Sequence, residues 1–207
     1  MRKMTYRRAY VAWVIIAAFG VIFFGCAGTS KPSNFYLLRA LPESEDSLTT
    51  AGGQGALSVL VGPITLPAYL DRTQIVTLFG NNELTMDEFS RWAEPLQDNF
   101  YRVLVENLSL LLNTPRVYSY DRRGPAPAEF QIIIDITRFE SDTRGDAYLT
   151  AFWTVVGKDG DSHKIERKSV FRATASTADL TGMVNAQNRL LTKFSREIAK
   201  TIRSLQR

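Results

Sequence analysis

FQIIIDITRF (130–139) and LTAFWTVV (149–156), the second followed by the turn GKDG (157–160), decide the fold of this chain. Two sets of apolar residues at every second position predict one buried face on each of two strands: Phe130, Ile132, Ile134 and Ile136, then Leu149, Ala151, Trp153 and Val155. The glycine-rich turn leads into a third predicted strand over 164–174. Because the connections are short, we expect an antiparallel meander.

Two segments on either side of the meander have the period of a helix instead. Residues 89–112 predict a first long helix, with Asp87 as a cap and Pro95 in the first turn, and residues 184–205 predict a second. The expected apolar faces are Trp92, Leu96, Phe100, Val103, Leu104, Leu108 and Leu111, then Val184, Leu191, Phe194, Ile198, Ile202 and Leu205. The sequence therefore predicts an α+β fold, a mostly antiparallel sheet with two long amphipathic helices packed on one face.

Shorter strands are expected towards the N-terminus. We predict them at 35–38, 57–61, 74–79, 83–85 and 116–120, with Gly80-Asn81-Asn82 as the turn of a hairpin. Gly62 and Pro63 are expected to stop the strand at 57–61. Pro63 and Pro67 make 64–70 extended without letting it be a central strand.

The first 26 residues have the pattern of an export signal. A basic start (Arg2, Lys3, Arg7, Arg8) precedes an uncharged apolar run over 11–24, and Gly25 stands before Cys26. This segment contains no Asp or Glu, so its removal leaves 21 basic against 21 acidic residues. A formally neutral domain lacks the positive excess that drives nucleic-acid binding, and no nucleic-acid partner is expected.

Phe23-Phe24-Gly25-Cys26 resembles a bacterial lipobox, in which the cysteine is acylated and becomes the new N-terminus. Residues 1–25 are then a lipoprotein signal peptide, 26–34 a lipidated cysteine with a flexible tether, and 35–207 a periplasmic domain. Ala27 after the cysteine implies, by the same resemblance, the outer membrane. The alternative is an uncleaved transmembrane anchor over 9–28, which places the domain in the periplasm too.

The residue inventory predicts no enzyme, cofactor or metal site. The single cysteine lies outside the domain, and the single histidine, His163, lies beside a predicted turn. One apolar segment, 64–72, is interrupted by proline and cannot form a regular central strand. We interpret it either as a cover over the core or as a contact for a partner or a second copy, through Pro67, Tyr69 and Leu70.

Four stretches together resemble the PqiC/YmbA-type lipoproteins, the ABC-type transport auxiliary lipoprotein component family. They are FYLL (35–38), VGPITLPAYLDR (61–72), RWAEPL (91–96) and the strand 130–139 followed by LTAFW (149–153). The resemblance implies a lipid-anchored outer-membrane protein on the periplasmic side. It would form a ring and serve as docking subunit of a mammalian-cell-entry (MCE) system that carries lipid between membranes. A structural envelope lipoprotein unconnected with transport is the alternative.

Overall fold

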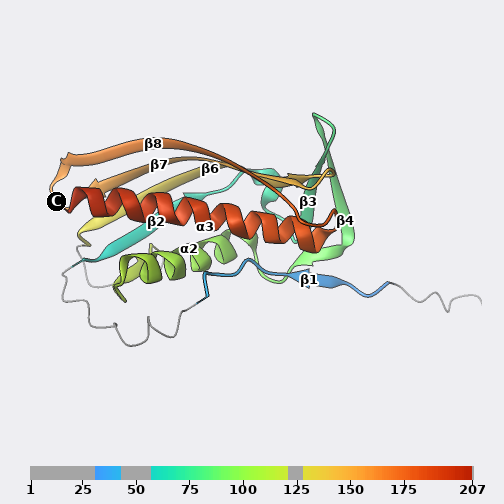
Figure 1. Cartoon of the computed structure of the whole chain (residues 1–207), viewed down its shortest axis with the longest axis horizontal. Coiled ribbons are helices and arrows are strands. Elements are labelled where there is room, and N and C mark those ends of the chain that lie inside the picture. The colour runs from blue at the N-terminus through green and yellow to red at the C-terminus, as the bar shows by residue number, and fades with distance from the viewer. Residues whose placement is uncertain (1–30, 43–56, 121–127, 207) are drawn as a thin grey trace, which may run out of the picture. The chain divides into compact units, whose positions relative to one another are not determined.

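The computed structural model describes residues 31–42, 57–120 and 128–206, with 161–163 described in their backbone alone (Figure 1). The chain divides into two compact units, 1–32 and 33–207. All the described helices and strands lie in the second unit. The predicted signal peptide and Cys26 lie outside the described residues.

One mixed sheet holds the eight strands of the described residues together. They are β1 (Asn34–Tyr36), β2 (Val59–Thr65), β3 (Gln74–Phe79), β4 (Glu83–Trp92), β5 (Val117–Ser119), β6 (Phe130–Asp142), β7 (Asp146–Gly157) and β8 (Gly160–Thr174). β6 is the centre, because its first half pairs in parallel with β2 and its last residues pair in parallel with β3. β7 runs antiparallel along its other side.

The predicted meander is confirmed. β6, β7 and β8 are antiparallel neighbours, and β8 begins at Gly160, earlier than the predicted residue 164. Gly160 has φ +70°, the left-handed conformation that its turn requires and that glycine adopts without strain. The alternating residues of both predicted faces are buried: Phe130, Ile132, Ile134, Ile136, Leu149, Ala151, Trp153 and Val155.

The N-terminal strands make the sheet mixed. The predicted hairpin around Gly80 is confirmed as β3 and β4, which are antiparallel. β1 occupies 34–36, where 35–38 was predicted, and it runs parallel to β4. β2 is parallel to both β5 and β6. The parallel partners are far apart in sequence, and the period of apolar residues within one strand says nothing of them.

The prediction that Gly62 and Pro63 stop the second strand was wrong. The Gly62–Pro63 peptide bond is cis, and β2 continues beyond it to Thr65, where Ile64 pairs with Ile134 of β6. The register shifts between Val61 and Ile64, so the proline stands at a bulge, where the ladder does not require its missing N–H. The rest of the segment forms a short 3₁₀ helix, η2 (Ala68–Leu70).

Two long helices, α2 (Leu96–Leu112) and α3 (Leu180–Leu205), lie side by side on one face of the sheet (Figure 1). α2 packs over β2 and β5, and α3 packs over β6, β7 and β8. Edge-to-face ring pairs join the layers: Phe100 of α2 with Phe139 of β6, and Phe194 of α3 with Trp153 of β7. The two predicted helices on one sheet face are therefore confirmed.

The predicted start of the first helix, residue 89, was seven residues early. Residues 90–92 belong to β4 and pair with β1, so Trp92 is buried from a strand. Asp87 does not cap the helix, because its carboxylate accepts hydrogen bonds from the Phe89 N–H and the Ser90 hydroxyl within β4, each at 2.9 Å. Pro95 directly precedes the helix, where its lack of an N–H costs nothing.

Candidate functional site

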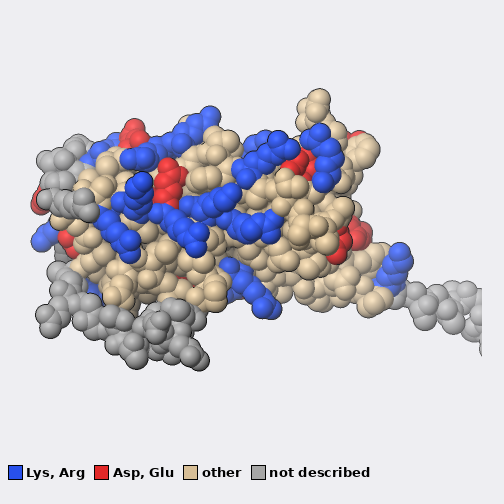
Figure 2. Space-filling model, in the orientation of Figure 1, with Lys and Arg blue, Asp and Glu red and all other residues tan. Residues whose placement is uncertain are grey.

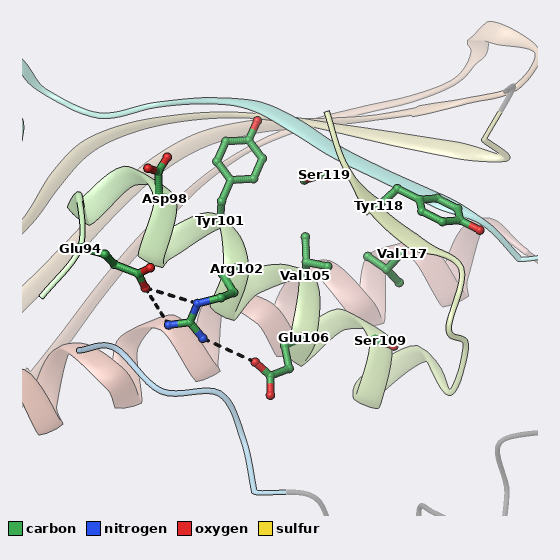
Figure 3. Close-up of a pocket in the computed structure, with 10 residues that line it drawn as sticks. All are labelled: Glu94, Asp98, Tyr101, Arg102, Val105, Glu106, Ser109, Val117, Tyr118 and Ser119. Carbon is green, nitrogen blue, oxygen red and sulfur yellow. Dashed lines mark hydrogen bonds and ion pairs between the residues drawn. The ribbon is translucent and has the colours of Figure 1, made fainter. Parts of the chain in front are cut away.

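An open groove runs between α2 and β5 (Figure 3). Its volume is about 650 Å³. Ten residues line it: Glu94, Asp98, Tyr101, Arg102, Val105, Glu106, Ser109, Val117, Tyr118 and Ser119. α2 supplies a polar wall and β5 a more apolar one. The polar wall follows from the amphipathic pattern of α2. Its apolar side packs on the sheet, so its polar side faces the groove beside the sheet edge.

Arg102 stands in the charged wall of this groove (Figure 3). Its Nη2 lies 2.7 Å from Glu94 Oε1, and its Nη1 lies 3.9 Å from Glu106 Oε2. All three side chains are partly exposed, so these ion pairs add little to stability. The lining also includes Asp98, which gives three carboxylates against one guanidinium. The groove is therefore negative overall and favours a positively charged guest.

β5 forms the other wall and is an edge of the sheet. In the part of the chain that the structure describes, it pairs with β2 alone. The Val59 N–H donates to the carbonyl of Arg116 at 2.9 Å, and the Tyr120 N–H donates to the carbonyl of Val61 at 2.8 Å. Since main-chain groups alternate along a strand, those of Val117 and Ser119 point away from β2. An extended peptide can add to such an edge.

Tyr101 joins the groove to the segment that follows the Gly62–Pro63 bond. The Ile64 N–H donates to the Tyr101 hydroxyl at 3.0 Å, and Gln97 Nε2 donates to the Ile64 carbonyl at 3.0 Å. Gly62 has φ +113°, and a Cβ there would lie 1.9 Å from the Tyr101 hydroxyl oxygen. Only glycine fits this position. The VGPI sequence that starts the predicted contact segment is thus fixed by α2.

The three residues predicted as a partner contact are placed differently from one another. Leu70 is 3% exposed and belongs to the core. Tyr69 is half-buried, and its hydroxyl donates to Glu140 Oε2 at 2.7 Å; burial and this carboxylate raise the pKa of Tyr69. Pro67 is half-buried and precedes the exposed Ala68 of η2. The inner side of the segment therefore packs on the core through Leu70, and Pro67 and Ala68 form its outer side. The contact itself stays a prediction.

Sequence reasoning missed a cluster of buried carboxylates at the β6–β7 turn. Glu140, Asp142 and Asp146 are 3%, 3% and 7% exposed. Three arginines compensate them in turn: Arg138 pairs with Glu140, Arg144 with Asp142 and Arg172 with Asp146. The alternation of charged residues at 138, 140, 142, 144 and 146 was the available signal. It resembles an exposed strand face, and only the fold shows that the carboxylates are covered.

Hydrogen bonds hold the carboxylates of Asp142 and Asp146 ionised. Burial alone would raise the pKa of Asp142, but hydrogen bonds from the Asp146 N–H and from Arg144 outweigh it, and the pKa is lowered. A hydrogen bond from Arg172, helped by one from Thr174, lowers the pKa of Asp146. Carboxylates held in this way fix the turn and are poor general acids or bases at neutral pH. The cluster is structural.

Nothing in the described residues assembles a metal site from three or more His, Cys, Asp or Glu side chains. Cys26 and the side chain of His163 lie outside what the structure describes. No helix within 31–42, 57–120 or 128–206 is long and apolar enough to cross a membrane. The groove itself offers charged side chains, a sheet edge and a few apolar side chains.

A family model for the ABC-type transport auxiliary lipoprotein component matches residues 36–199, most of the chain. The chain belongs to this family. The resemblance of its four sequence stretches to the PqiC/YmbA-type lipoproteins is thereby confirmed. By its description, the family is an auxiliary lipoprotein component of ABC-type transport. The match takes in the groove, all of α2, and α3 apart from its last six residues.

Two solved structures share the fold of this auxiliary lipoprotein. One is an uncharacterised protein with a TM-score of 0.67 and 18% identity, covering 83% of this chain and 99% of its own. The other is a DUF330 protein from Xanthomonas campestris with a TM-score of 0.65 and 19% identity, covering 84% of this chain and 98% of its own. No curated protein matches the chain by sequence.

Proposed function

We propose that this auxiliary lipoprotein is the docking subunit of an MCE-type system that carries lipid between membranes. Acylated Cys26 attaches it to the outer membrane, and the domain over 35–207 lies in the periplasm. It catalyses nothing. Its part is to hold the end of an envelope-spanning MCE protein, and copies of the chain form a ring around that end. Membership of a transport auxiliary lipoprotein family supports the general role.

In this proposal, the α2–β5 groove is the surface that binds the partner. It combines an open volume of about 650 Å³ with a sheet edge, and its lining is negative. Strand addition at β5 gives a partner affinity through main-chain hydrogen bonds, and Glu94, Asp98 and Glu106 select one with basic side chains. We propose that the guest is an extended basic segment of the MCE protein or of the neighbouring copy.

The predicted contact at Pro67, Tyr69 and Leu70 adjoins this groove through Tyr101 and Ile64. We propose that Pro67 and Ala68 extend the docking surface beyond the groove. Leu70 anchors this segment in the core, and the hydrogen bond from Tyr69 to Glu140 fixes the orientation of the segment on the sheet. A Tyr69→Glu variant would place a second carboxylate against Glu140 and is expected to abolish both assembly and partner binding.

Site-specific photocrosslinking in envelopes tests the groove. A benzoylphenylalanine at Tyr118 replaces one aromatic residue of the groove, and the matched control replaces Phe152, which is exposed on the helix-free face of the sheet. We expect an MCE protein, a second copy of the chain, or both, to crosslink at Tyr118 and not at Phe152. Equal crosslinking at the two positions would contradict a docking groove.

The intact mass of the tagged chain from the same envelopes tests the anchor separately. Acylation predicts a species that begins at Cys26 and carries lipid. A full-length species of 23.3 kDa would instead indicate the uncleaved transmembrane anchor. An acylated chain that crosslinks to no MCE protein at Tyr118 would support the alternative, a structural envelope lipoprotein unconnected with transport.

A further inference from the structure

The outer side of α3 carries one unbroken line of positive charge. Between residues 189 and 203 every exposed residue of the helix is a lysine or an arginine. These five, here named the α3 stripe, are Arg189, Lys193, Arg196, Lys200 and Arg203. Their spacing of four and three residues keeps them on one side over about 21 Å of helix. Figure 2 shows basic side chains gathered across the face where Figure 1 places α3.

Among the residues that the structure describes, the stripe has no acidic partner in an ion pair. None of the ion pairs within the described residues involves a stripe residue. Glu197 is half-buried, and its carboxylate is engaged by the Ser169 hydroxyl at 2.6 Å. Arg189 and Arg203 donate to the carbonyls of Thr174 and Leu111, contacts that leave their charge uncompensated. Five neighbouring cations repel one another, and an anionic partner would relieve that repulsion.

Two shallow hollows flank the stripe and share Arg196. The first, about 450 Å³, is lined by Arg189 and Lys193 together with Arg39, whose N–H donates to Asn188 of α3. Leu41 and Pro42 line it as well. The second, about 380 Å³, is lined by Lys200 and Arg203 together with Leu111 and Ala199. The described residues that line the two hollows include no carboxylate. Each hollow therefore combines cations with apolar side chains.

We propose that the α3 stripe binds the headgroups of an anionic phospholipid bilayer. The hollows offer cations to a lipid phosphate and apolar side chains to the glycerol and the first methylenes beneath it. Rows of four or more Lys and Arg on an amphipathic helix suit anionic bilayers, where each contributes to attraction at the surface. A protein partner fits less well, because protein interfaces are anchored by buried aromatic residues as well as by arginine, and the stripe contains no aromatic residue.

This surface goes beyond the proposed docking role and rests on it only for the nearness of a membrane. The stripe occupies residues 189–203, whereas acylation concerns Cys26 and docking concerns the α2–β5 groove. A tether from Cys26 to Asn34 can extend over about 25 to 30 Å, enough for the domain to turn α3 towards the membrane that holds the anchor. The acyl chain then supplies one attachment and the stripe a second.

Vesicle flotation of the full chain tests the inference, with phosphatidylcholine vesicles compared with vesicles that contain 30% phosphatidylglycerol. The N-terminal apolar segment is the same in every sample, so the readout is the preference for the anionic vesicles over the neutral ones. We expect Lys193→Gln/Arg196→Gln/Lys200→Gln to lose that preference by roughly ten-fold or more. The preference of the unaltered chain should fall with rising salt and persist in millimolar inorganic phosphate, since a bilayer binds through many headgroups at once.

A matched variant, Arg72→Gln/Lys158→Gln/Lys168→Gln, removes the same charge from exposed residues outside α3 and is expected to keep the preference. Equal preference in the two triple variants would overturn the inference. The inference would also be overturned if the stripe variant kept its preference for anionic vesicles but lost the binding of an acidic protein. The stripe would then be a binding site for that protein. Crosslinking at Tyr118 should be unchanged by either variant, so failure of the stripe and failure of the docking groove are distinguishable.

Discussion

Leu38 and Asn99 exchange two hydrogen bonds. The Leu38 N–H donates to Asn99 Oδ1 at 2.6 Å, and Asn99 Nδ2 donates back to the Leu38 carbonyl at 3.2 Å. Both residues are buried, at 1% and 0% exposure. The side-chain amide of α2 thus takes the place of a strand neighbour just after β1 ends. Asn107, further along α2, makes a similar contact: its Oδ1 accepts a hydrogen bond from the Leu41 N–H at 2.7 Å.

Asn99→Ala should therefore release the segment that connects β1 to the rest of the domain. A buried main-chain donor and acceptor lose their partners, which costs about 1–3 kcal/mol for each group. We expect the free energy of unfolding to fall by about 2 kcal/mol or more in urea denaturation of the solubilised chain. Asn185→Ala, at an exposed position of α3, is the control and should change it by less than about 0.5 kcal/mol. Equal effects of the two substitutions would contradict this role of Asn99.

Gly62→Ala should destabilise the fold far more than Gly80→Ala, although both glycines have positive φ. A Cβ on Gly80 meets nothing within 4 Å, so the cost there is that of a left-handed alanine, about 1–2 kcal/mol. A Cβ on Gly62 would overlap the Tyr101 hydroxyl, and α2 or β2 would have to shift. We expect a further loss of about 1–3 kcal/mol by chemical denaturation.

The double variant Gly62→Ala/Tyr101→Phe is the test of cause. Removal of the hydroxyl relieves the shortest contact of the new Cβ, at 1.9 Å, and leaves Tyr101 Cζ and Tyr120 Cβ each at 2.8 Å. The loss from the second substitution should therefore be smaller in the Gly62→Ala background than in the native chain. Strict additivity of the two losses would show that the clash with Tyr101 is not the reason.

The sequence predicted best the elements in which one periodicity holds throughout. Apolar residues stand at every second position from Phe130 to Ile136 and from Leu149 to Val155, and their strands, faces and pairing were predicted correctly. Residues 89–92 were assigned to the helix because Trp92 is in phase with Leu96. In the sequence, a buried residue at the end of a strand can look like the first apolar residue of the helix that follows, when the two are one helical turn apart. Only pairing with β1 distinguishes them.

The functional surfaces were less predictable because each depends on elements distant in sequence. The α2–β5 groove needs the sheet order, which follows from parallel pairs such as β2 with β5 and leaves no local pattern. Leu70 was a candidate for an exposed contact because prolines exclude a central strand. The structure makes it the last residue of the 3₁₀ helix η2, with its side chain in the core. The α3 stripe is the exception, because its basic residues follow one another at steps of four and three between 189 and 203 of the sequence.

Acid should weaken the β6–β7 turn through Asp142 and Asp146. Both pKa values lie below the ordinary 3.8 in the folded chain, so folding favours the ionised carboxylates. Their contribution to stability is complete well above pH 4 and is lost as the pH falls through 4 towards the folded pKa values. Asp142→Asn keeps an acceptor oxygen for the N–H groups of Arg144 and Asp146 without a titrating charge. Urea unfolding between pH 5 and pH 3 should therefore show a shallower loss of stability in Asp142→Asn than in the native chain.

Tyr148→Phe should act on the same slope by a smaller amount, because the Tyr148 hydroxyl donates only one of the hydrogen bonds to Asp142, at 3.1 Å. The native chain and Asp142→Asn would have parallel pH profiles if this carboxylate were equally easy to protonate in the folded and unfolded states. That result would contradict the assigned cause.

A chain of two hydrogen bonds should decide how firmly α3 is held against the sheet. Trp153 Nε1 donates to Ser169 Oγ at 2.8 Å, and that hydroxyl donates to Glu197 Oε2 at 2.6 Å, so β7, β8 and α3 meet at one oxygen. Ser169→Ala leaves a buried indole N–H without its acceptor, at a cost of about 1–3 kcal/mol. Ser169→Thr keeps the hydroxyl and should recover much of the loss, whereas Ser204→Ala, at an exposed position of α3, should cost less than about 0.5 kcal/mol.

The flotation preference of Ser169→Ala for phosphatidylglycerol vesicles should be unchanged at temperatures where the variant remains folded. Ser169 attaches α3 to the sheet, whereas the α3 stripe contacts the membrane. Loss of that preference in the folded variant would mean that the position of α3 and its binding of headgroups are coupled.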